Sequence, residues 1–376
     1  MARILVLGAG MVGSAMARDL GRRHQVLCAD RDPAALAGLA GAEGVATQEL
    51  DCTDHDALRA VAAEQDLVVC AVPGFLGFAT LSCLIEAGKP VADISFFPEE
   101  ALELDRKARE AGVAVVTDIG VAPGIDNLIL GMHDASMKVE RFECLVGGLP
   151  VARTMPWQYK APFSPVDVVE EYLRPARLME NGRVVVREAL SEPSYEVFAG
   201  IGTLEAFNTD GLRSLLTTMA HIPDMAERTL RYPGHRELAW SLRESGFLSD
   251  KPVGAGEGAF VPREVTSRML FREWKLEPGE PELTVMRVTV EGEEGGRQVR
   301  HVWDLDDRTD ADGVSSMSRT TGYTCTGMAE AMLAGQWTRP GVAPPEVVGR
   351  EAGLWEGIRA HLQDRGVVLD HRVEAL

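Results

Sequence analysis

The sequence predicts an α/β protein with a doubly wound parallel sheet, followed by a second, α+β domain on a mixed or antiparallel sheet. Three observations predict this. Apolar strand-like runs alternate with helical segments over the first third of the chain, as parallel strands with helical crossovers require. After about residue 127, the runs instead resemble antiparallel strands. The length of 376 residues suits two domains.

The first elements form a strand, a glycine turn, a helix and a second strand. An apolar run at residues 3–7 leads into a G-x-G-x-x-G pattern at residues 8–13. Small and apolar residues continue at helical spacing over 14–20, and a second apolar run occupies 25–29. This order is typical of the first βαβ unit of a Rossmann-type sheet.

The glycine turn is predicted to bind a dinucleotide. Gly8 permits a tight turn, Gly10 lets the backbone approach a pyrophosphate, and Gly13 lets helix and strand pack closely. The pyrophosphate would lie on the N–H groups at the start of the helix. Asp30 can accept a hydrogen bond from the ribose 2′-hydroxyl and would repel a 2′-phosphate, so NAD is favoured over NADP, although Arg31 could partly neutralise that phosphate. The alternative is a glycine turn that only packs the βαβ unit.

Further cofactor contacts are expected where later strands end. The apolar strand at 67–72 ends near the point where the strand order of such a sheet reverses, so Val72 and Pro73 should line the cofactor. Residues 51–53 lie where related folds hold the adenine, with a simple turn as the alternative. The candidate cofactor residues are Gly8, Gly10, Met11, Val12, Gly13, Asp30, Arg31, Asp51, Cys52, Val72 and Pro73.

The remaining pattern predicts two domains, a dinucleotide-binding domain at 1–125, completed by about 316–376, and a substrate-binding and dimerisation domain at 126–315. The other expected elements of the first domain are helices at 81–88 and 98–111 and strands at 90–94 and 113–116. Those of the second are strands at 142–146, 183–187, 283–290 and 297–303, with a hairpin loop at 291–296. A helix at 321–335 should pack on the first domain, followed by a helix at 353–365 and a final short strand.

Composition argues against several classes of partner. The net charge of −19 disfavours nucleic acid and anionic membranes. The uncharged stretch at 67–85 is interrupted by Pro73, Gly74 and Gly77, so no membrane span is expected. The six cysteines show no paired spacing, so we expect thiols and a reducing compartment. The N-terminus runs straight into the first predicted strand, so no signal peptide and a cytoplasmic protein are expected. No His, Cys and Asp cluster has metal-ligand spacing, and no metal is expected.

Longer motifs follow in order along almost the whole chain. They are D-I-S-F-F-P-E-E at 93–100, D-I-G-V-A-P-G-I-D-N at 118–127, G-G-L-P at 147–150, E-A-F-N-T-D-G-L-R-S-L at 205–215, T-L-R-Y-P-G-H at 229–235 and R-T-T-G-Y at 319–323. In these motifs the chain resembles the saccharopine dehydrogenase-like family, and most closely its lysine 6-dehydrogenase branch. The resemblance implies a nicotinamide-dependent oxidoreductase that makes or breaks a C–N bond.

Two departures bear on the substrate. Saccharopine reductases of this family carry an arginine, which would bind a dicarboxylate, where this chain has Thr209, and usually an aromatic residue where it has His235. Both departures favour oxidative deamination of the L-lysine 6-amino group to the semialdehyde and its cyclic imine. The alternatives are a saccharopine or carboxynorspermidine dehydrogenase and a non-catalytic NAD-binding protein.

Two residues are candidate catalytic groups. Asp126 lies in the loop that follows the strand at 113–116, where ligands of α/β sheets bind. A close carboxylate favours the ammonium form of an amine, so Asp126 is expected to position the amine, or else to cap the loop. His235 is the candidate base through the family match, with a surface turn histidine as the alternative. Because a lysine amine has a pKa near 10.4, deprotonation should give an alkaline rate optimum.

The other candidates would bind the substrate. Asp118 has the same loop-capping alternative as Asp126, and Arg213 could bind a carboxylate or pair with an acid such as Glu205. The threonines of R-T-T-G-Y could donate to the same carboxylate or cap a following helix. The candidates are Asp118, Asn127, Arg213, Thr320 and Thr321. Edge strands of the second domain predict a homodimer.

Overall fold

The computed structural model describes residues 1–162, 165–277 and 279–376. The chain forms two compact units, the first comprising 1–137 and 317–368 and the second 138–316 and 369–376. The expected boundary at 125/126 falls inside helix α6 (Ile125–Asp134), after its first residue, and the whole helix instead joins the first unit, where it packs against α12 (Pro345–Gly349).

The first unit is built on a seven-stranded parallel sheet in the order β15-β6-β5-β4-β1-β2-β3, which confirms the predicted doubly wound sheet. The strand order reverses between β1 and β4, where ligands of such sheets bind. The strands are β1 (Arg3–Leu7), β2 (Gln25–Asp30), β3 (Val45–Glu49), β4 (Leu67–Cys70), β5 (Val91–Asp93), β6 (Ala114–Val116) and β15 (Gly341–Ala343). The helices besides α6 and α12 are α1 (Met11–Gly21), α2 (Pro33–Ala37), α3 (His55–Ala63), α4 (Gly74–Glu86), η1 (Ala101–Leu104), α5 (Asp105–Ala111), α11 (Ser316–Leu333) and α13 (Leu354–Gln363).

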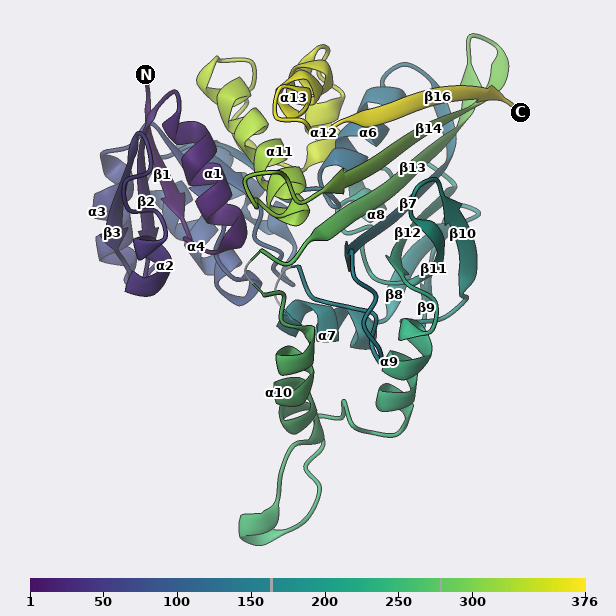
Figure 1. Ribbon diagram of the computed structural model, residues 1–376. Coiled ribbons are helices and arrows are strands. Elements are labelled where there is room, and N and C mark those ends of the chain that lie inside the picture. Colours follow the sequence, from purple (N-terminus) through teal and green to yellow (C-terminus); the bar gives the residue numbers. More distant parts are fainter. Residues whose placement is uncertain (163–164, 278) are drawn as a thin grey trace. The chain divides into compact units, whose positions relative to one another are not determined.

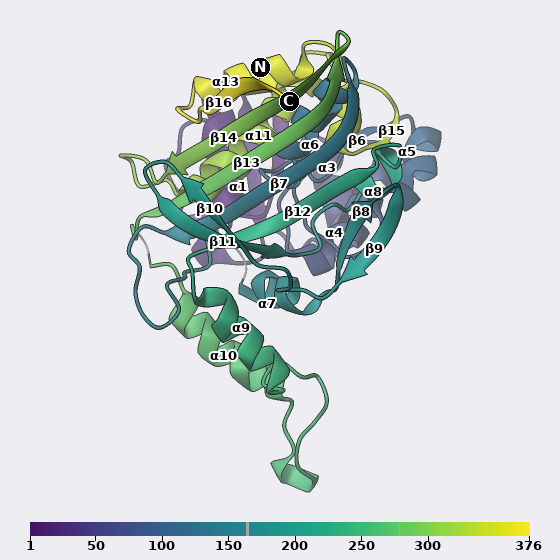
Figure 2. The ribbon, with the colours of Figure 1, turned by 90° about the vertical axis from the view of Figure 1, so that its right-hand side faces the viewer.

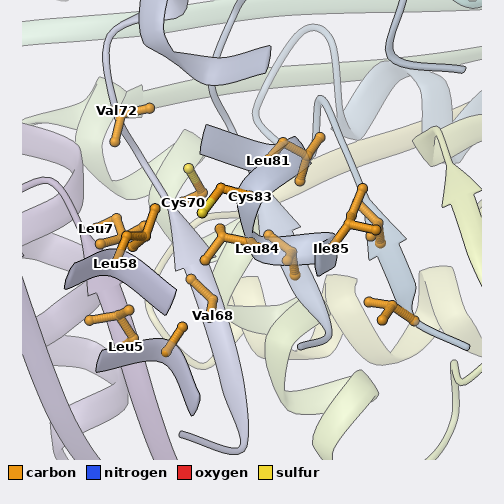
Figure 3. Close-up of a cluster of buried hydrophobic side chains, with 14 of the residues drawn as sticks. Leu5, Leu7, Leu58, Val68, Cys70, Val72, Leu81, Cys83, Leu84 and Ile85 are labelled. Atoms are coloured by element: carbon orange, nitrogen blue, oxygen red, sulfur yellow. The ribbon is translucent and has the colours of Figure 1, made fainter. Parts of the chain in front are cut away.

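Apolar side chains cover one face of this sheet. Leu5 of β1 and Val68 of β4 are partners in the parallel register, so their side chains point to the same face. Figure 3 shows both among side chains of α4, including Leu81 and Leu84, and all four are buried. The parallel pairing of β4 with β5 and of β5 with β6 places their carboxyl ends beside one another.

Local differences from the predicted elements have simple causes. The helix predicted at 98–111 is a 3₁₀ turn, η1, followed by α5, and it ends at Gly112 with a φ of 69°, as the glycine signal predicts. The hairpin loop predicted at 291–296 is shorter, because β13 continues to Glu294 and pairs with Arg297 of β14. Only Gly295 and Gly296 remain to make the turn.

The second unit is built on a nine-stranded mixed sheet, as predicted. Figure 2 shows β14, β13, β7 and β12 side by side, and Figure 1 shows β16 along β14. The strands are β7 (Lys138–Pro150), β8 (Ala176–Glu180), β9 (Arg183–Arg187), β10 (Ser194–Phe198), β11 (Gly202–Asn208), β12 (Asp224–Arg231), β13 (Glu282–Glu294), β14 (Arg297–Arg308) and β16 (Leu369–Ala375). The helices are α7 (Pro165–Leu173), α8 (Leu215–Thr218), α9 (His235–Glu244), η2 (Gly256–Gly258) and α10 (Pro262–Trp274).

Both units therefore show the predicted architecture. The helix predicted at 321–335 is α11, which belongs to the first unit, and the final strand is β16, which belongs to the second. Among the described helices, none has the length and apolar character needed to cross a bilayer.

Candidate functional site

The glycine turn of the first unit has the geometry that its three glycines predict. A Cβ at Gly8, whose φ is 98°, would lie 2.5 Å from the carbonyl oxygen of Ala71. A Cβ at Gly13 would lie 2.0 Å from the carbonyl oxygen of Gly8. Around Gly10, by contrast, a Cβ would meet no described atom within 4 Å. Close packing thus requires glycine at positions 8 and 13, whereas Gly10 faces the open space that an approaching pyrophosphate needs.

The start of α1 suits an anion. Its N-cap is Gly10, which has no side chain to cap the first turn, and the first turn contains no acidic residue. The N–H groups of a helix start carry a partial positive charge and point outward along the axis. Met11 is half exposed and Val12 is partly exposed. The residues present therefore fit the phosphates of a dinucleotide.

Asp30 lies beside the same turn. Its Oδ2 accepts a hydrogen bond from the Ala9 N–H at 2.7 Å, and its Oδ1 accepts one from the Asp32 N–H at 2.9 Å. These bonds hold the carboxylate at the end of β2, where it would accept a hydrogen bond from a ribose hydroxyl. Arg31, next to it, is exposed.

The other predicted cofactor residues lie at the ends of strands in the same unit. Pro73 is the N-cap of α4 and follows Val72, which is buried. Asp51 accepts hydrogen bonds from the Thr53 N–H at 2.9 Å and its Oγ1 at 2.8 Å, which lower the pKa of Asp51. These hydrogen bonds form the simple turn that is the alternative to adenine contact for residues 51–53. Cofactor contact by Asp51 and Cys52 stays a prediction.

The first turn of α6 holds the predicted catalytic residue Asp126 and the predicted substrate residue Asn127 in capping contacts. The Gly124 N–H donates to Asp126 Oδ1 at 3.0 Å and to Asn127 Oδ1 at 3.3 Å. Asn127 Nδ2 donates to Glu346 Oε2 at 2.9 Å, and all three side chains are fully buried. The capping alternative therefore describes these contacts, while catalysis by Asp126 and substrate binding by Asn127 stay predictions.

Asp118 and Thr321 both lie at the loop between β6 and α6. Asp118 is buried with a φ of 54°, a left-handed conformation that non-glycine residues adopt mainly at functional sites and turns. A Cβ at Gly120 would lie 3.2 Å from Thr321 Cγ2, so Thr321 packs against the loop. Thr320 is buried one residue earlier in α11. The alternative that the threonines cap a following helix is wrong, because α11 already begins at Ser316.

His235 lies in a buried aromatic cluster of the second unit rather than on its surface. Its Nε2 lies 2.9 Å from the Tyr172 hydroxyl, and its Nδ1 lies 3.0 Å from the Trp157 carbonyl oxygen. Since a carbonyl oxygen only accepts, Nδ1 carries the proton and Nε2 accepts from Tyr172. Trp274 and Tyr159 contact the ring with centroids 5.8 and 4.7 Å away.

The charge state of His235 follows from this setting. Burial, with a further effect from the cationic Arg231, lowers the pKa of His235 to about 3. The imidazole is therefore neutral near pH 7, and both of its nitrogens are engaged. The prediction that His235 is the catalytic base still stands as a prediction, and it requires the Tyr172 hydroxyl to give up its bond.

Arg231 is the cation of this cluster and was not predicted as a site residue. Its Nε donates to the Tyr172 hydroxyl at 3.1 Å, and its guanidinium carbon lies 4.6 Å from the centroid of the Tyr159 ring. It also pairs with Glu171 at 3.4 Å. The signal was present in the T-L-R-Y-P-G-H motif, but only the fold shows that its arginine and histidine share Tyr172.

Arg213 has a different setting. It lies half-buried in the turn before α8, with a φ of 43°. Glu205, its predicted alternative partner, is buried and accepts from Arg236 Nε at 3.1 Å and from the Gly234 N–H at 3.4 Å. Binding of a substrate carboxylate by Arg213 stays a prediction.

The fold and the glycine turn define a dinucleotide-binding protein of the doubly wound α/β class. Residues 4–116 match the family model described as the saccharopine dehydrogenase NADP binding domain, and residues 120–367 match the saccharopine dehydrogenase C-terminal domain. The chain therefore belongs to the saccharopine dehydrogenase family, which confirms the resemblance seen in the sequence.

Relatives agree with this assignment. The saccharopine dehydrogenase (NADP(+), L-glutamate-forming) of Schizosaccharomyces pombe is 29% identical over 296 residues, which cover 73% of this chain and 65% of that protein. The chain spans less than two thirds of the length of the curated relatives it matches. The apo saccharopine dehydrogenase (L-Glu forming) of Saccharomyces cerevisiae has a TM-score of 0.81 at 22% identity over the whole of both chains, so it shows the same fold. Homospermidine synthase of Legionella pneumophila, solved with NAD, has a TM-score of 0.67 at 13% identity, covering 99% of this chain and 91% of that one.

Proposed function

We propose that this protein is an NAD(P)-dependent oxidoreductase acting on a C–N bond of an amino acid, and that it oxidatively deaminates the 6-amino group of L-lysine. The observation that carries the proposal is the glycine turn, with open space at Gly10 and Asp30 beside it, in a chain of the saccharopine dehydrogenase family. A bound nicotinamide supplies the hydride acceptor. The rest of the chemistry is deprotonation and positioning of the amine by the protein.

The choice of lysine rests on residues 208–211. Thr209 is buried, and its hydroxyl lies 2.8 Å from that of Thr229, so a hydroxyl pair fills the position where saccharopine reductases carry an arginine. Saccharopine reductases of the family carry a serine where this chain has Gly211. A Cβ at Gly211 would lie 2.2 to 2.5 Å from the Glu227 carboxyl group, so a serine there would require rearrangement. Both differences remove groups that would suit a second substrate carboxylate.

Saccharopine oxidation is the second candidate. It is supported by relatives named saccharopine dehydrogenase and by relatives named alpha-aminoadipic semialdehyde synthase. The same names and the family model favour NADP, whereas Asp30 favours NAD. We propose NAD, supported by the carboxylate beside the turn.

The first experiment mixes purified protein with L-lysine and NAD and follows NADH absorbance, with saccharopine and NADP in parallel. Reduction with lysine is expected, and its rate should rise between about pH 7 and pH 10 as the amine, of pKa near 10.4, loses its proton. Turnover of saccharopine alone would contradict the lysine proposal. Binding of the cofactor without any NADH formation from lysine or saccharopine would instead favour a non-catalytic NAD-binding protein.

Substitution of Gly10 tests the cofactor site separately from stability. Gly10→Ala should weaken NAD binding roughly tenfold or more, about 1.4 kcal/mol, because its methyl group enters the space kept for the pyrophosphate. The melting temperature should stay unchanged, since the Cβ meets no described atom within 4 Å. Gly357→Ala is the matched control, because its Cβ is equally unobstructed and it lies in α13. Equal NAD affinities of the two variants, measured by calorimetry, would exclude Gly10 from the site.

We also propose a homodimer formed through the second sheet. Exposed apolar side chains lie on strands at or near its edges, among them Val184 and Val186 of β9 and Tyr195 and Val197 of β10. Exposed apolar strands are typical of association surfaces. Sedimentation measurements of the mass in solution test this, and a monomer at all concentrations would contradict it.

A further inference from the structure

Asp93 is a fully buried carboxyl group in the first unit that the proposed function has not used. It is the last residue of β5, with an exposed fraction of 0%. Neither carboxyl oxygen has a hydrogen-bond partner of ordinary geometry among the described residues. An ionised carboxylate without such partners is costly to bury, so this position requires an explanation.

The register shows what surrounds Asp93. Cys70 of β4 is its partner in the parallel sheet, and the pairs 91/115 and 92/116 place Thr117 next to it on the other side. Residues in register point to the same face. Thr117 is also buried, and its hydroxyl has no hydrogen-bond partner among the described residues. Two unsatisfied polar side chains thus lie together at the carboxyl ends of β5 and β6, on the same edge of the sheet as the switch point between β1 and β4 where ligands bind.

A second acid lies beside this pair. The Ile119 N–H donates to the Asp93 carbonyl oxygen at 3.1 Å, which ties the residue after Asp118 to the end of β5. Asp118 is the buried residue whose left-handed φ of 54° was described above. The two carboxyl groups are close enough for the charge of Asp118 to act on Asp93.

Burial raises the pKa of Asp93 to about 7, and the negative charge of Asp118 adds to the rise. Ser95 and the Cys70 thiol lie near enough to lower it in part. In α11, burial and the negative charge of Asp93 raise the pKa of the Cys325 thiol well above its usual value. Both thiols stay neutral, so Asp118 is the charged group that most affects the proton on Asp93.

We propose that Asp93 is the proton store of the amine oxidation, taking a proton from the substrate ammonium through Asp118. The role rests on the proposed function. The step balances as follows: the ammonium N–H bond breaks, its proton passes by Asp118 to the Asp93 carboxylate, and the neutral amine keeps the electron pair. The C–H bond then breaks, its hydride reduces NAD(P)⁺, and the nitrogen electron pair forms the C=N bond of the iminium product.

This assignment supplies a proton acceptor for the amine, which His235 provides poorly near neutral pH. His235 is neutral with both nitrogens engaged, and a base of pKa about 3 takes up few protons near neutrality. General bases work best when their pKa lies near the working pH. Asp93 acts through Asp118 in this scheme, so it is a positioning residue that holds the proton rather than a group in contact with substrate.

The test combines a rate profile with a measurement that needs no turnover. Asp93→Asn should lower the kcat for lysine roughly 10² to 10⁴-fold and remove the rise in kcat near neutral pH. Asp118→Asn should keep the fold, because asparagine tolerates a left-handed φ, and should also lower kcat, because an amide cannot pass the proton on to Asp93. Asp56→Asn, which removes an exposed carboxylate from α3 of the same unit, should leave the profile unchanged. An unaltered profile in Asp93→Asn would overturn the proposal.

Thermal unfolding supplies the independent readout. A carboxyl whose folded pKa lies above its unfolded value loses stabilisation as pH rises, here between about pH 4 and pH 7. The melting temperature of the natural chain should therefore fall across this range more steeply than that of Asp93→Asn. Equal slopes would overturn the proposal even in an active enzyme. Inactivity of the natural chain with every amine, together with unequal slopes, would overturn the proposed function and the proton-transfer role, while leaving the buried acid established.

Discussion

Replacing Asp19 with alanine is expected to lower the free energy of unfolding of the first unit by about 3–5 kcal/mol, because it leaves a largely buried cation without its partner. Asp19 lies in α1 and is almost fully buried. Its Oδ1 accepts from Arg365 Nε at 2.7 Å, and its Oδ2 accepts from Thr326 Oγ1 at 2.7 Å. His361 Nε2 lies 3.5 Å from the same Oδ2. One carboxylate thus ties α1 to α11 and to the end of α13.

Urea unfolding of the natural chain and the variant would measure this loss. Glu110→Ala is the matched control, because it also removes an acid paired with an arginine in the first unit, Arg106, but both side chains are exposed. Exposed pairs contribute less than about 1 kcal/mol. If the two substitutions lowered stability equally, the buried network would contribute no more than an ordinary surface pair.

The same network sets a pH dependence of known sign. Burial alone would raise the pKa of Asp19, but hydrogen bonds from His361, Arg365 and Thr326 outweigh it and lower the pKa to about 2. An acid with a depressed folded pKa stabilises the protein above its unfolded pKa, near 3.9, and loses that contribution as pH falls toward 2. Asp19→Asn should flatten the stability curve between about pH 4 and pH 2, the opposite end of the range from Asp93.

Local sequence patterns were sufficient for the first unit's sheet and for its glycine turn. The strand 3–7, the three glycines and Asp30 lie within thirty residues, and each role depends on neighbours close in the chain. The unexpected break of the helix predicted at 98–111 into η1 and α5 is a local detail that charge periodicity does not encode. A sequence pattern indicates that a helix is present more reliably than it indicates the conformation of that helix's first turn.

The roles that escaped the sequence depend on contacts between distant segments. Asp93 opens a motif that was recognised, but its isolation is set by burial and by its register with β4 and β6. His235 follows a turn signal typical of a surface residue, yet Tyr172 from α7 and Trp274 from α10 enclose it. Burial decides whether a carboxyl or an imidazole is charged, and burial is a property of the folded chain.

Replacing Asp30 with serine is expected to shift the cofactor preference toward NADP by roughly tenfold to a hundredfold, or about 1.4 to 2.8 kcal/mol. The carboxylate is fixed beside the glycine turn by the N–H groups of Ala9 and Asp32, so it cannot swing away from a 2′-phosphate without breaking both bonds. Like charges placed together cost several kcal/mol at a binding interface. Serine removes the repulsion and keeps a hydroxyl for the ribose.

The measurement is the ratio of kcat/KM for NAD to that for NADP, with dissociation constants of both cofactors as a readout that needs no turnover. Asp30→Asn is the matched control for the turn, because its side-chain oxygen can still accept from the Ala9 N–H while its charge is gone. If repulsion decides the preference, both variants shift toward NADP, and Arg31→Ala moves the natural chain further toward NAD. If the natural chain already prefers NADP and Arg31→Ala weakens that cofactor alone, then the exposed Arg31 outweighs Asp30, and the chain shares the cofactor named for its relatives. A ratio unchanged by all three substitutions would place the ribose away from the end of β2.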